Sequence, residues 1–372
     1  KGNLTVEDAF NDIGKKANAS LRLPDTRGSR HSPPLVRMDF GTAGQRWVAV
    51  VGTDYIPNNN TSGTVYLLDM KTGAPVQVPG GQDAARVAGV IPLAVNEGIG
   101  GEPAAVDANE DGNAELIYVA TTKGKIYRIA THNPDASREF GRVMQVCLLA
   151  DVQKALSKST KSEYKQEAPY QGVYSSMSVQ LNPGTNGKTV RLFVGTANNP
   201  DIANEPADLL PTPPHGYILA FEDAAPTGTS CNTKEEESKL LAPLWIKQLG
   251  AGQMVWGGLT LAQSKDDTTV TTATAVGKAA NACELSSKQS GMIYSVSAKN
   301  PEPDKQAVGT SLNGHSLATP VLHDGHMIML TADGKVLVRG DPNGWNTGAG
   351  NTEPGRVRVH MWDADPSGVL KP

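Results

Sequence analysis

The sequence predicts an all-β fold, a β-propeller built from about five or more irregular blades with loop and short-helix insertions. Two observations predict it. The 372 residues include 39 glycines and 25 prolines, a content that suits many turns and short strands better than long helices. A unit of two strands joined through a glycine-containing turn also recurs five times along the chain. Because such a unit cannot bury both of its faces alone, its copies are expected to stack around an axis.

Each repeat consists of an apolar strand, a turn of small residues, a glycine, and an alternating strand that carries tyrosine or another large residue. β-branched and aromatic residues favour strands, and glycine favours the turns between them. A β-sandwich is the competing fold, but a sandwich does not require the same unit five times. The five strand pairs are 46–53 with 63–69, 115–121 with 123–129, 190–196 with 216–221, 271–277 with 290–296, and 326–332 with 334–339.

The propeller is expected to occupy residues 31–365 as one domain. Residues 1–30 are predicted to be a polar linker with a short helix at Val6–Lys16, because Thr5 can cap a helix there. Residues 366–372 are predicted to form a C-terminal tail.

Insertions interrupt the repeats near residues 143–168 and 223–241. The first is charged, and Val143–Leu156 within it is predicted to form a short helix. The second contains Glu235–Glu237 and is predicted to be a solvated loop. The Gly- and Pro-rich loop Asp341–Pro354 is a candidate contact site, because loops on a rigid scaffold often carry function.

Composition excludes several classes of partner. The net charge of −4 offers no basic field for nucleic acid or for an anionic membrane. No run approaches the roughly 18 consecutive apolar residues of a membrane-spanning helix, so no transmembrane segment is expected. The first residues are polar and unlike the apolar core of an export signal. The numbered chain is therefore expected to be a mature protein or a fragment, whose signal was removed or lies upstream.

The three cysteines, Cys147, Cys231 and Cys283, match no CxxC spacing of a metal or redox site. In an oxidising compartment, a disulfide between Cys231 and Cys283 would join two loop-rich segments and leave Cys147 over. Free buried thiols are the alternative.

One stretch of the sequence indicates a specific chemistry. Asp107–Glu115 (DANEDGNAE) places oxygen-bearing side chains at loop positions 1, 3, 5 and 9 and a glycine at position 6, as in the front half of an EF-hand loop. Ca²⁺ takes about six to eight oxygen ligands at ~2.3–2.6 Å. The predicted ligands are the side chains of Asp107, Asn109, Asp111 and Glu115 and the backbone carbonyl of Asn113.

Short apolar runs at 103–106 and 116–120 flank this loop, so it is predicted to join two strands and not two helices. The ion would then be structural and hold a hairpin together. A metal-free acidic hairpin is the alternative. His315, His323 and His326 are a weaker metal candidate, because they bracket a turn in which polar residues are expected anyway.

The strand segment Gly63–Gly73 (GTVYLLDMKTG) and the acidic loop running into Tyr118–Ile129 (YVATTKGKIYRI) resemble the C-terminal domain of the PilY-type type IV pilus tip proteins. The resemblance extends from about Ser32 to Trp362 and is strongest over Gly101–Ile129. It implies a modified β-propeller with a calcium loop between strands.

Two departures from the family pattern matter. Family loops often carry Asp at positions 3 and 9, where this chain has Asn109 and Glu115, and fewer negative charges imply weaker binding. The family's von Willebrand-like N-terminal domain is not visible in this sequence, so adhesion borne by that domain is not assigned to this chain.

The resemblance also implies a function. It describes a calcium-binding, cell-surface protein that supports pilus biogenesis, adhesion or twitching motility as a tip or assembly factor, through protein contacts. The implied partners are pilin or minor pilin subunits and a host or abiotic surface. The implied location is extracellular, at the pilus tip or outer membrane, after export through the periplasm.

Two other classes are alternatives. A periplasmic propeller scaffold of the outer-membrane assembly type shares the repeat but does not require a calcium loop. A quinoprotein-like dehydrogenase needs a catalytic Asp and a stack of tryptophans, whereas the five tryptophans here do not recur at one place in the repeat. Because a fold alone does not imply an activity, an enzyme is not expected.

Overall fold

The computed structural model describes most of the chain between His31 and Arg339. The predicted helix Val6–Lys16, the loop Asp341–Pro354 and the C-terminal tail lie outside the described residues. The ranges outside the description are 1–30, 41–43, 54–61, 77–88, 131–144, 185–186, 198–214, 225, 227–236, 264–267, 277–290, 300–309, 313–315, 317, 324–325, 332–333 and 340–372.

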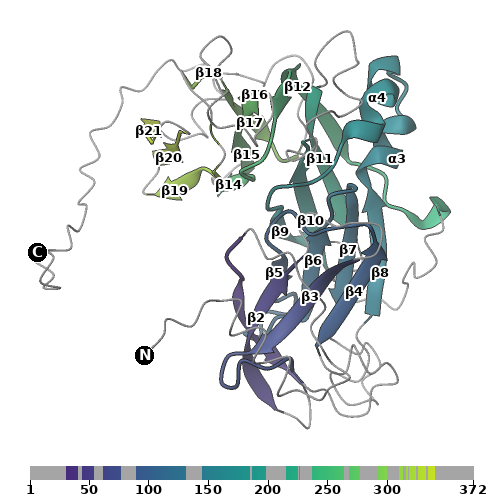
Figure 1. Cartoon of the computed structure of the whole chain (residues 1–372), viewed down its shortest axis with the longest axis vertical. Coiled ribbons are helices and arrows are strands. Elements are labelled where there is room, and N and C mark those ends of the chain that lie inside the picture. The colour runs from purple at the N-terminus through teal and green to yellow at the C-terminus, as the bar shows by residue number, and fades with distance from the viewer. Residues whose placement is uncertain are drawn as a thin grey trace, which may run out of the picture.

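In the described residues, five antiparallel sheets of three or four strands follow one another along the chain, from the β1–β4 sheet at the bottom of Figure 1 to the β19–β21 sheet at the upper left. Each sheet is a meander, because its strands are paired in the order in which they occur in the sequence.

The first sheet contains β1 (Leu35–Asp39), β2 (Gln45–Gly52), β3 (Ser62–Asp69) and β4 (Val90–Val95). The second contains β5 (Ala104–Val106), β6 (Leu116–Ala120), β7 (Lys125–Ala130) and β8 (Gln145–Asp151). The third contains β9 (Ser178–Gly184), β10 (Gly187–Gly195), β11 (His215–Asp223) and β12 (Trp245–Ala251). The fourth contains β14 (Thr260–Gln263), β15 (Thr268–Ala273), β17 (Met292–Ser297) and β18 (Thr310–Ser311). The fifth contains β19 (Val321–His323), β20 (His326–Leu330) and β21 (Val336–Arg339), and β13 (Gln253–Met254) pairs separately with β16 (Ala275–Val276).

The core lies in layers between consecutive sheets. Successive side chains of a strand point to opposite faces, so one strand can serve two layers. On β6, Ile117 and Val119 pack against the first sheet, while Tyr118 packs against the third. Similar apolar layers join the third sheet to the fourth and the fourth to the fifth. The inner sheets are therefore buried on both faces, as the repeat analysis predicts.

The backbones of neighbouring sheets also come close together just before each sheet begins. A Cβ added to Gly101 would overlap the backbone carbonyl of Ser175, and one added to Gly257 would overlap that of Ala318. Ser176 and Gly258 form an isolated parallel bridge in the same region. Glycine is required at these positions because no other residue lets two backbones approach so closely.

A buried ion pair joins the second and third sheets. Arg128 on β7, which is 2% exposed, donates through one guanidinium nitrogen to both carboxylate oxygens of Asp223 on β11, at 2.8 and 3.1 Å. The Tyr118 hydroxyl donates to the same carboxylate at 3.0 Å. Burial, reinforced by the negative charge of Asp223, raises the pKa of Tyr118 far above its usual value. Asp223 is buried and is the last residue of β11. The solvated insertion predicted for 223–241 therefore wrongly includes this strand residue.

The first insertion contains helices, but not where the sequence predicts the first one. Residues 145–151 of the predicted helix Val143–Leu156 form β8, which pairs with β7 along its length. The helix α3 (Val152–Ser157) begins only where the Asp151 carboxylate accepts from the Lys154 backbone N–H at 3.0 Å, and α4 (Ser162–Glu167) follows it. An available strand edge thus prevails over a weak helical pattern. Two short 3₁₀ helices, η2 (Ala168–Tyr170) and η4 (Glu237–Lys239), complete the described helices.

Cys147 lies buried on β8 and is disulfide-bonded. The expectation that Cys147 is left over as a thiol is therefore wrong. Cys231 and Cys283, whose pairing the sequence suggests, lie outside the described residues. Sequence spacing could not show which loop meets β8, whereas the fold places Leu241 beside it, with its backbone N–H donating to the Leu149 carbonyl at 2.7 Å.

None of the helices in the described part of the chain has the length and apolarity that crossing a bilayer demands.

Candidate metal centre

The acidic loop Asp107–Glu115 connects β5 to β6, as predicted. Its conformation is held by hydrogen bonds from backbone N–H groups of the loop to its own carboxylates. The backbone N–H of Gly112 donates to Asp107 Oδ2 at 2.6 Å, and that of Asp111 donates to Asp107 Oδ1 at 3.2 Å. Asp111 Oδ1 in turn accepts from the backbone N–H of Asn113 at 2.8 Å. Asp and Asn side chains favour turns by accepting from the backbone in this way. Gly112 has a φ of +88°, which glycine adopts without strain.

The loop brings three carboxylates together. Oxygens of Asp107, Asp111 and Glu115 all lie within 4.8 Å of one another, and no other group of three acidic, histidine or cysteine ligands meets this criterion in the described residues. Two ligands of one Ca²⁺ lie at most about 5 Å apart, because each is ~2.3–2.6 Å from the ion. The spacing and the hard oxygen donors therefore fit calcium.

These carboxylates have contrasting environments. Burial raises the pKa of Glu115, and the charges of Asp107 and Asp111 raise it further, although the backbone N–H of Ala108 donates to its Oε2 at 2.9 Å. The pKa of exposed Asp111 is lowered, chiefly by the backbone N–H of Asn113. The carboxylates of this one loop therefore extend from the buried Glu115 to the exposed Asp111.

The two asparagines lie beside the carboxylates. Asn109 Oδ1 accepts from the backbone N–H of Asp111 at 2.9 Å, and its amide donates to Asp111 Oδ2 at 3.2 Å. The buried Asn113 side chain donates to Asp111 Oδ1 at 3.0 Å and accepts from Arg37 Nε at 3.0 Å. Asn113 enters the predicted ligand set only through its backbone carbonyl, so its side-chain contacts leave that prediction as it stands.

Cations from both neighbouring sheets contact the loop. Arg37 on β1 also donates from Nε to the Gly112 carbonyl at 3.2 Å, and its own carbonyl accepts from the Ala114 N–H at 2.7 Å. Lys188 on β10 forms an ion pair with Glu110 at 2.7 Å. The loop therefore touches three sheets. The sequence does not indicate Arg37 or Lys188, because both are far from the loop along the chain.

The histidine pair ends a hairpin. His323 and His326 are directly opposite one another in the β19–β20 pairing, and His323 is exposed. This agrees with the interpretation of a surface turn. His315 lies outside the described residues.

No protein-family model matches the sequence, and no curated protein matches it. Among solved structures, the chain is similar to the PilY1 C-terminal domain of Pseudomonas aeruginosa, with a TM-score of 0.50 and 15% identity over 83% of this chain and 72% of that one. The chain shares the fold of that domain.

The predicted propeller fold and the resemblance to the PilY-type domain are thereby confirmed at the level of fold. BamB from Moraxella catarrhalis also matches, with a TM-score of 0.34 and 13% identity over 84% of this chain and 60% of that one. A quinohemoprotein alcohol dehydrogenase from Comamonas testosteroni matches with a TM-score of 0.34 and 13% identity, over 77% of this chain and 43% of that one.

Proposed function

We propose that this PilY1-like propeller is a calcium-binding, cell-surface protein that supports type IV pilus assembly, adhesion or twitching motility through protein contacts and not through catalysis. The observation that carries the calcium part is the group of three carboxylates, which lie within 4.8 Å of one another in a loop between strands. The shared fold with the PilY1 C-terminal domain supports the pilus part. Its partners would be pilin or minor pilin subunits, met outside the cell after export through the periplasm.

The position of the loop suggests what calcium would do. Asp107, Asp111 and Glu115 would hold the ion, with Asn109 and the Asn113 carbonyl as further oxygen ligands. A bound dication offsets the mutual repulsion of these carboxylates and fixes the loop. The loop contacts Arg37 on the first sheet and Lys188 on the third. A fixed loop would therefore keep the second sheet attached to both of its neighbours.

Calcium is expected to bind at one site and to raise the melting temperature. Asp111→Asn removes a ligand charge at an exposed position, so the variant should fold and lose the calorimetric binding signal. At a calcium concentration 100 times the Kd, the gain in unfolding free energy is about 2.7 kcal/mol, which melting curves in calcium and in chelator will detect.

Glu110→Gln is the matched control, because Glu110 is acidic and exposed in the same loop but outside the predicted ligands. This variant should bind calcium like the wild type apart from a small charge effect. Absence of binding heat at millimolar calcium, with identical melting in chelator, would refute the metal site.

The pilus role needs a separate test in the source organism. Deletion of the coding region is expected to reduce surface pili and twitching, and the wild-type gene to restore both. A complementing Asp111→Asn gene should restore them incompletely. Normal pilus numbers and motility in the deletion strain would reject the pilus role and leave the calcium site untouched.

A further inference from the structure

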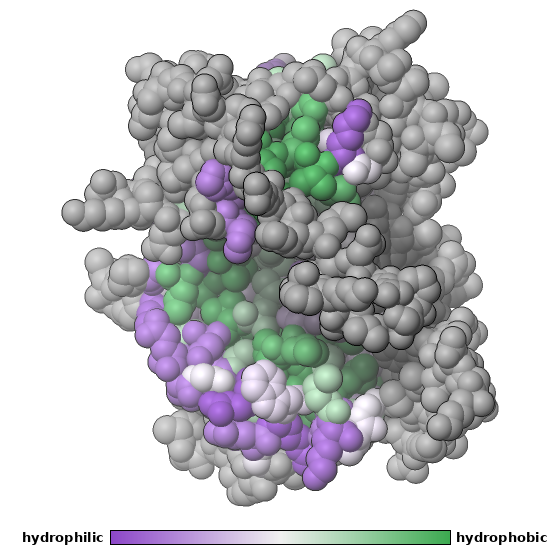
Figure 2. Space-filling model, turned by 90° about the vertical axis from the view of Figure 1, so that its left-hand side faces the viewer, coloured by the Kyte–Doolittle hydropathy of each residue, from purple (hydrophilic) through white to green (hydrophobic). Residues whose placement is uncertain are grey.

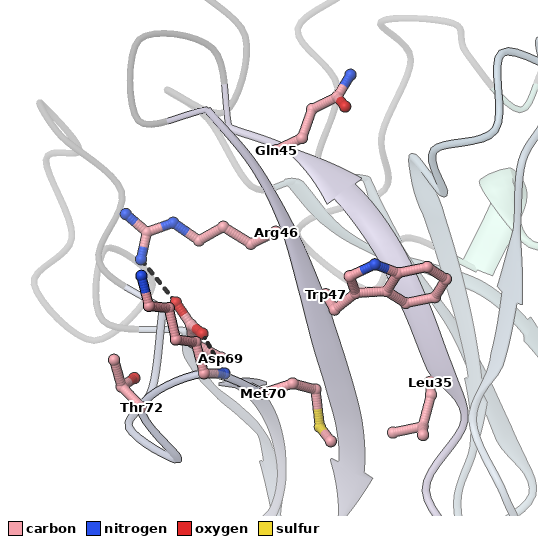
Figure 3. A pocket seen from close by; sticks show the side chains of 8 residues that line it. Leu35, Gln45, Arg46, Trp47, Asp69, Met70 and Thr72 are labelled. Carbon is pink, nitrogen blue, oxygen red and sulfur yellow. Dashed lines mark hydrogen bonds and ion pairs between the residues drawn. The ribbon is translucent and has the colours of Figure 1, made fainter.

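A pocket of about 760 Å³ opens at one end of the first sheet, where β2 begins and β3 ends. Leu35 lines it from β1 and Trp47 from β2, and the turn after β3 contributes Met70, Lys71 and Thr72 (Figure 3). Small-molecule sites typically have about 300–1,000 Å³, so the pocket has room for one or two side chains of a partner. The acidic loop does not line the pocket.

The apolar lining of this pocket is unusually exposed. Trp47 is 58%, Leu35 55% and Met70 51% exposed, although residues 48–52 of the same strand β2 are all buried. Seven large apolar side chains are exposed in the described part of the chain, and three of them meet here. On the face drawn in Figure 2, hydrophobic residues reach the surface in an upper and a lower region, and hydrophilic residues border the lower one. Exposed Trp and Met beside Arg are enriched at the anchor points of protein interfaces.

Two of the residues that line the pocket, Arg46 and Lys71, are cationic, and one, Asp69, is anionic. The Arg46 guanidinium pairs with Asp69 at 2.7 Å, and the Lys71 backbone N–H donates to the other oxygen of that carboxylate at 2.7 Å (Figure 3). Burial of Asp69 opposes ionisation, but these contacts outweigh it and lower its pKa, so its charge is present and balanced by Arg46. The exposed Lys71 ammonium makes no ion pair within the described residues, so one positive charge remains at the rim.

We propose that this pocket is a docking site for a segment of a partner protein in which an apolar side chain lies next to a carboxylate. The apolar side chain would pack among Trp47, Leu35 and Met70, and the carboxylate would face the exposed ammonium of Lys71. Charge complementarity selects this occupant over a basic or uncharged one. The proposal is independent of calcium and would stand if the metal loop were empty.

The probe is the capped peptide Asp-Trp-Leu-Asp, compared with Lys-Trp-Leu-Lys by calorimetry or chemical-shift titration. The acidic peptide is expected to bind at least about tenfold more tightly than the basic one at low salt. Its carboxylates attract the Lys71 ammonium, the lysines of the basic peptide repel it, and low salt screens these interactions little. Trp47→Ser is expected to lower the affinity for the acidic peptide at least about tenfold, because it removes the main apolar anchor. Lys71→Glu is expected to abolish the preference for the acidic peptide.

Leu330→Ser is the matched control, because Leu330 is 50% exposed but lies on the fifth sheet. Its affinity for the acidic peptide should equal that of the wild type. Failure of the acidic peptide to saturate, equal binding of both peptides, or an unchanged affinity in Trp47→Ser would overturn the proposal. Sedimentation showing a wild-type dimer that Trp47→Ser abolishes would assign the pocket to a second copy of the chain and overturn it as well.

Discussion

Arg128→Met is expected to lower the free energy of unfolding by about 3–5 kcal/mol, because it leaves the Asp223 carboxylate buried without its cation. Methionine fills much of the space of the arginine stem, so lost packing contributes little. Urea denaturation followed by tryptophan fluorescence measures the loss. The Tyr118 hydroxyl still donates to Asp223, but one neutral donor does not replace a guanidinium that contacts both oxygens.

Two comparisons separate this effect from a general loss of charge. Lys188→Met removes an ion pair at a partly exposed position, where screening by solvent limits the cost to about 1 kcal/mol or less. Arg128→Met combined with Asp223→Leu should recover much of the stability, because no buried charge is left unpaired. An Arg128→Met protein that unfolds at the wild-type urea concentration would show that water reaches this layer.

Gly101→Ala is expected to destabilise the fold by about 3 kcal/mol, at the upper end of the usual cost of overpacking. The added Cβ would overlap the Ser175 carbonyl and come within 2.7 Å of the Ser176 backbone nitrogen. Backbone atoms cannot rotate away as a side chain can. The second and third sheets must therefore separate locally, which would also disturb the hydrogen bond from the Glu102 N–H to Ser176 Oγ, 3.1 Å long.

Gly250→Ala tests whether the kind of neighbour decides the cost. Its Cβ would meet only side-chain atoms, the Tyr294 hydroxyl at 3.0 Å and Gln253 Cγ at 3.3 Å, which can move. Its expected cost is under about 1 kcal/mol, because alanine loses less conformational entropy than glycine in a strand, and this gain offsets part of the cost of the new contacts. Melting temperatures of the two variants provide the comparison, and equal losses would contradict the backbone argument.

The sequence predicts the strands that are buried on both faces, because β-branched and aromatic residues concentrate there. β6 and β7 are examples, since nearly all of their residues are buried. It misses strands such as β9 (SVQLNPG) and β4 (VIPLAV), which contain polar residues or proline. These strands are defined by pairing with a neighbour, and local preference does not report that pairing. β8 is mistaken for helix for the same reason.

The convergence of Asp107, Asp111 and Glu115 was predictable, because these residues belong to one short loop whose spacing brings their carboxylates together. The contacts of Arg37 and Lys188 with that loop were not, because they depend on how separate sheets pack. The sequence did not predict the Trp47 pocket either, because the exposure of a side chain also depends on how the sheets pack. A tryptophan in an apolar strand predicts burial, and only the packed structure shows that nothing in the described chain covers it.

The serial packing of the sheets has a mechanical consequence. The described chain begins in the first sheet and ends in the fifth, and the packing layers join consecutive sheets. A pulling force on the two ends of the described chain therefore passes through these packing layers one after another and does not shear all of them in parallel. The molecule should therefore extend in steps, each of which unfolds one sheet. The second and third sheets, joined by the buried ion pair of Arg128 and Asp223, should be among the last to separate.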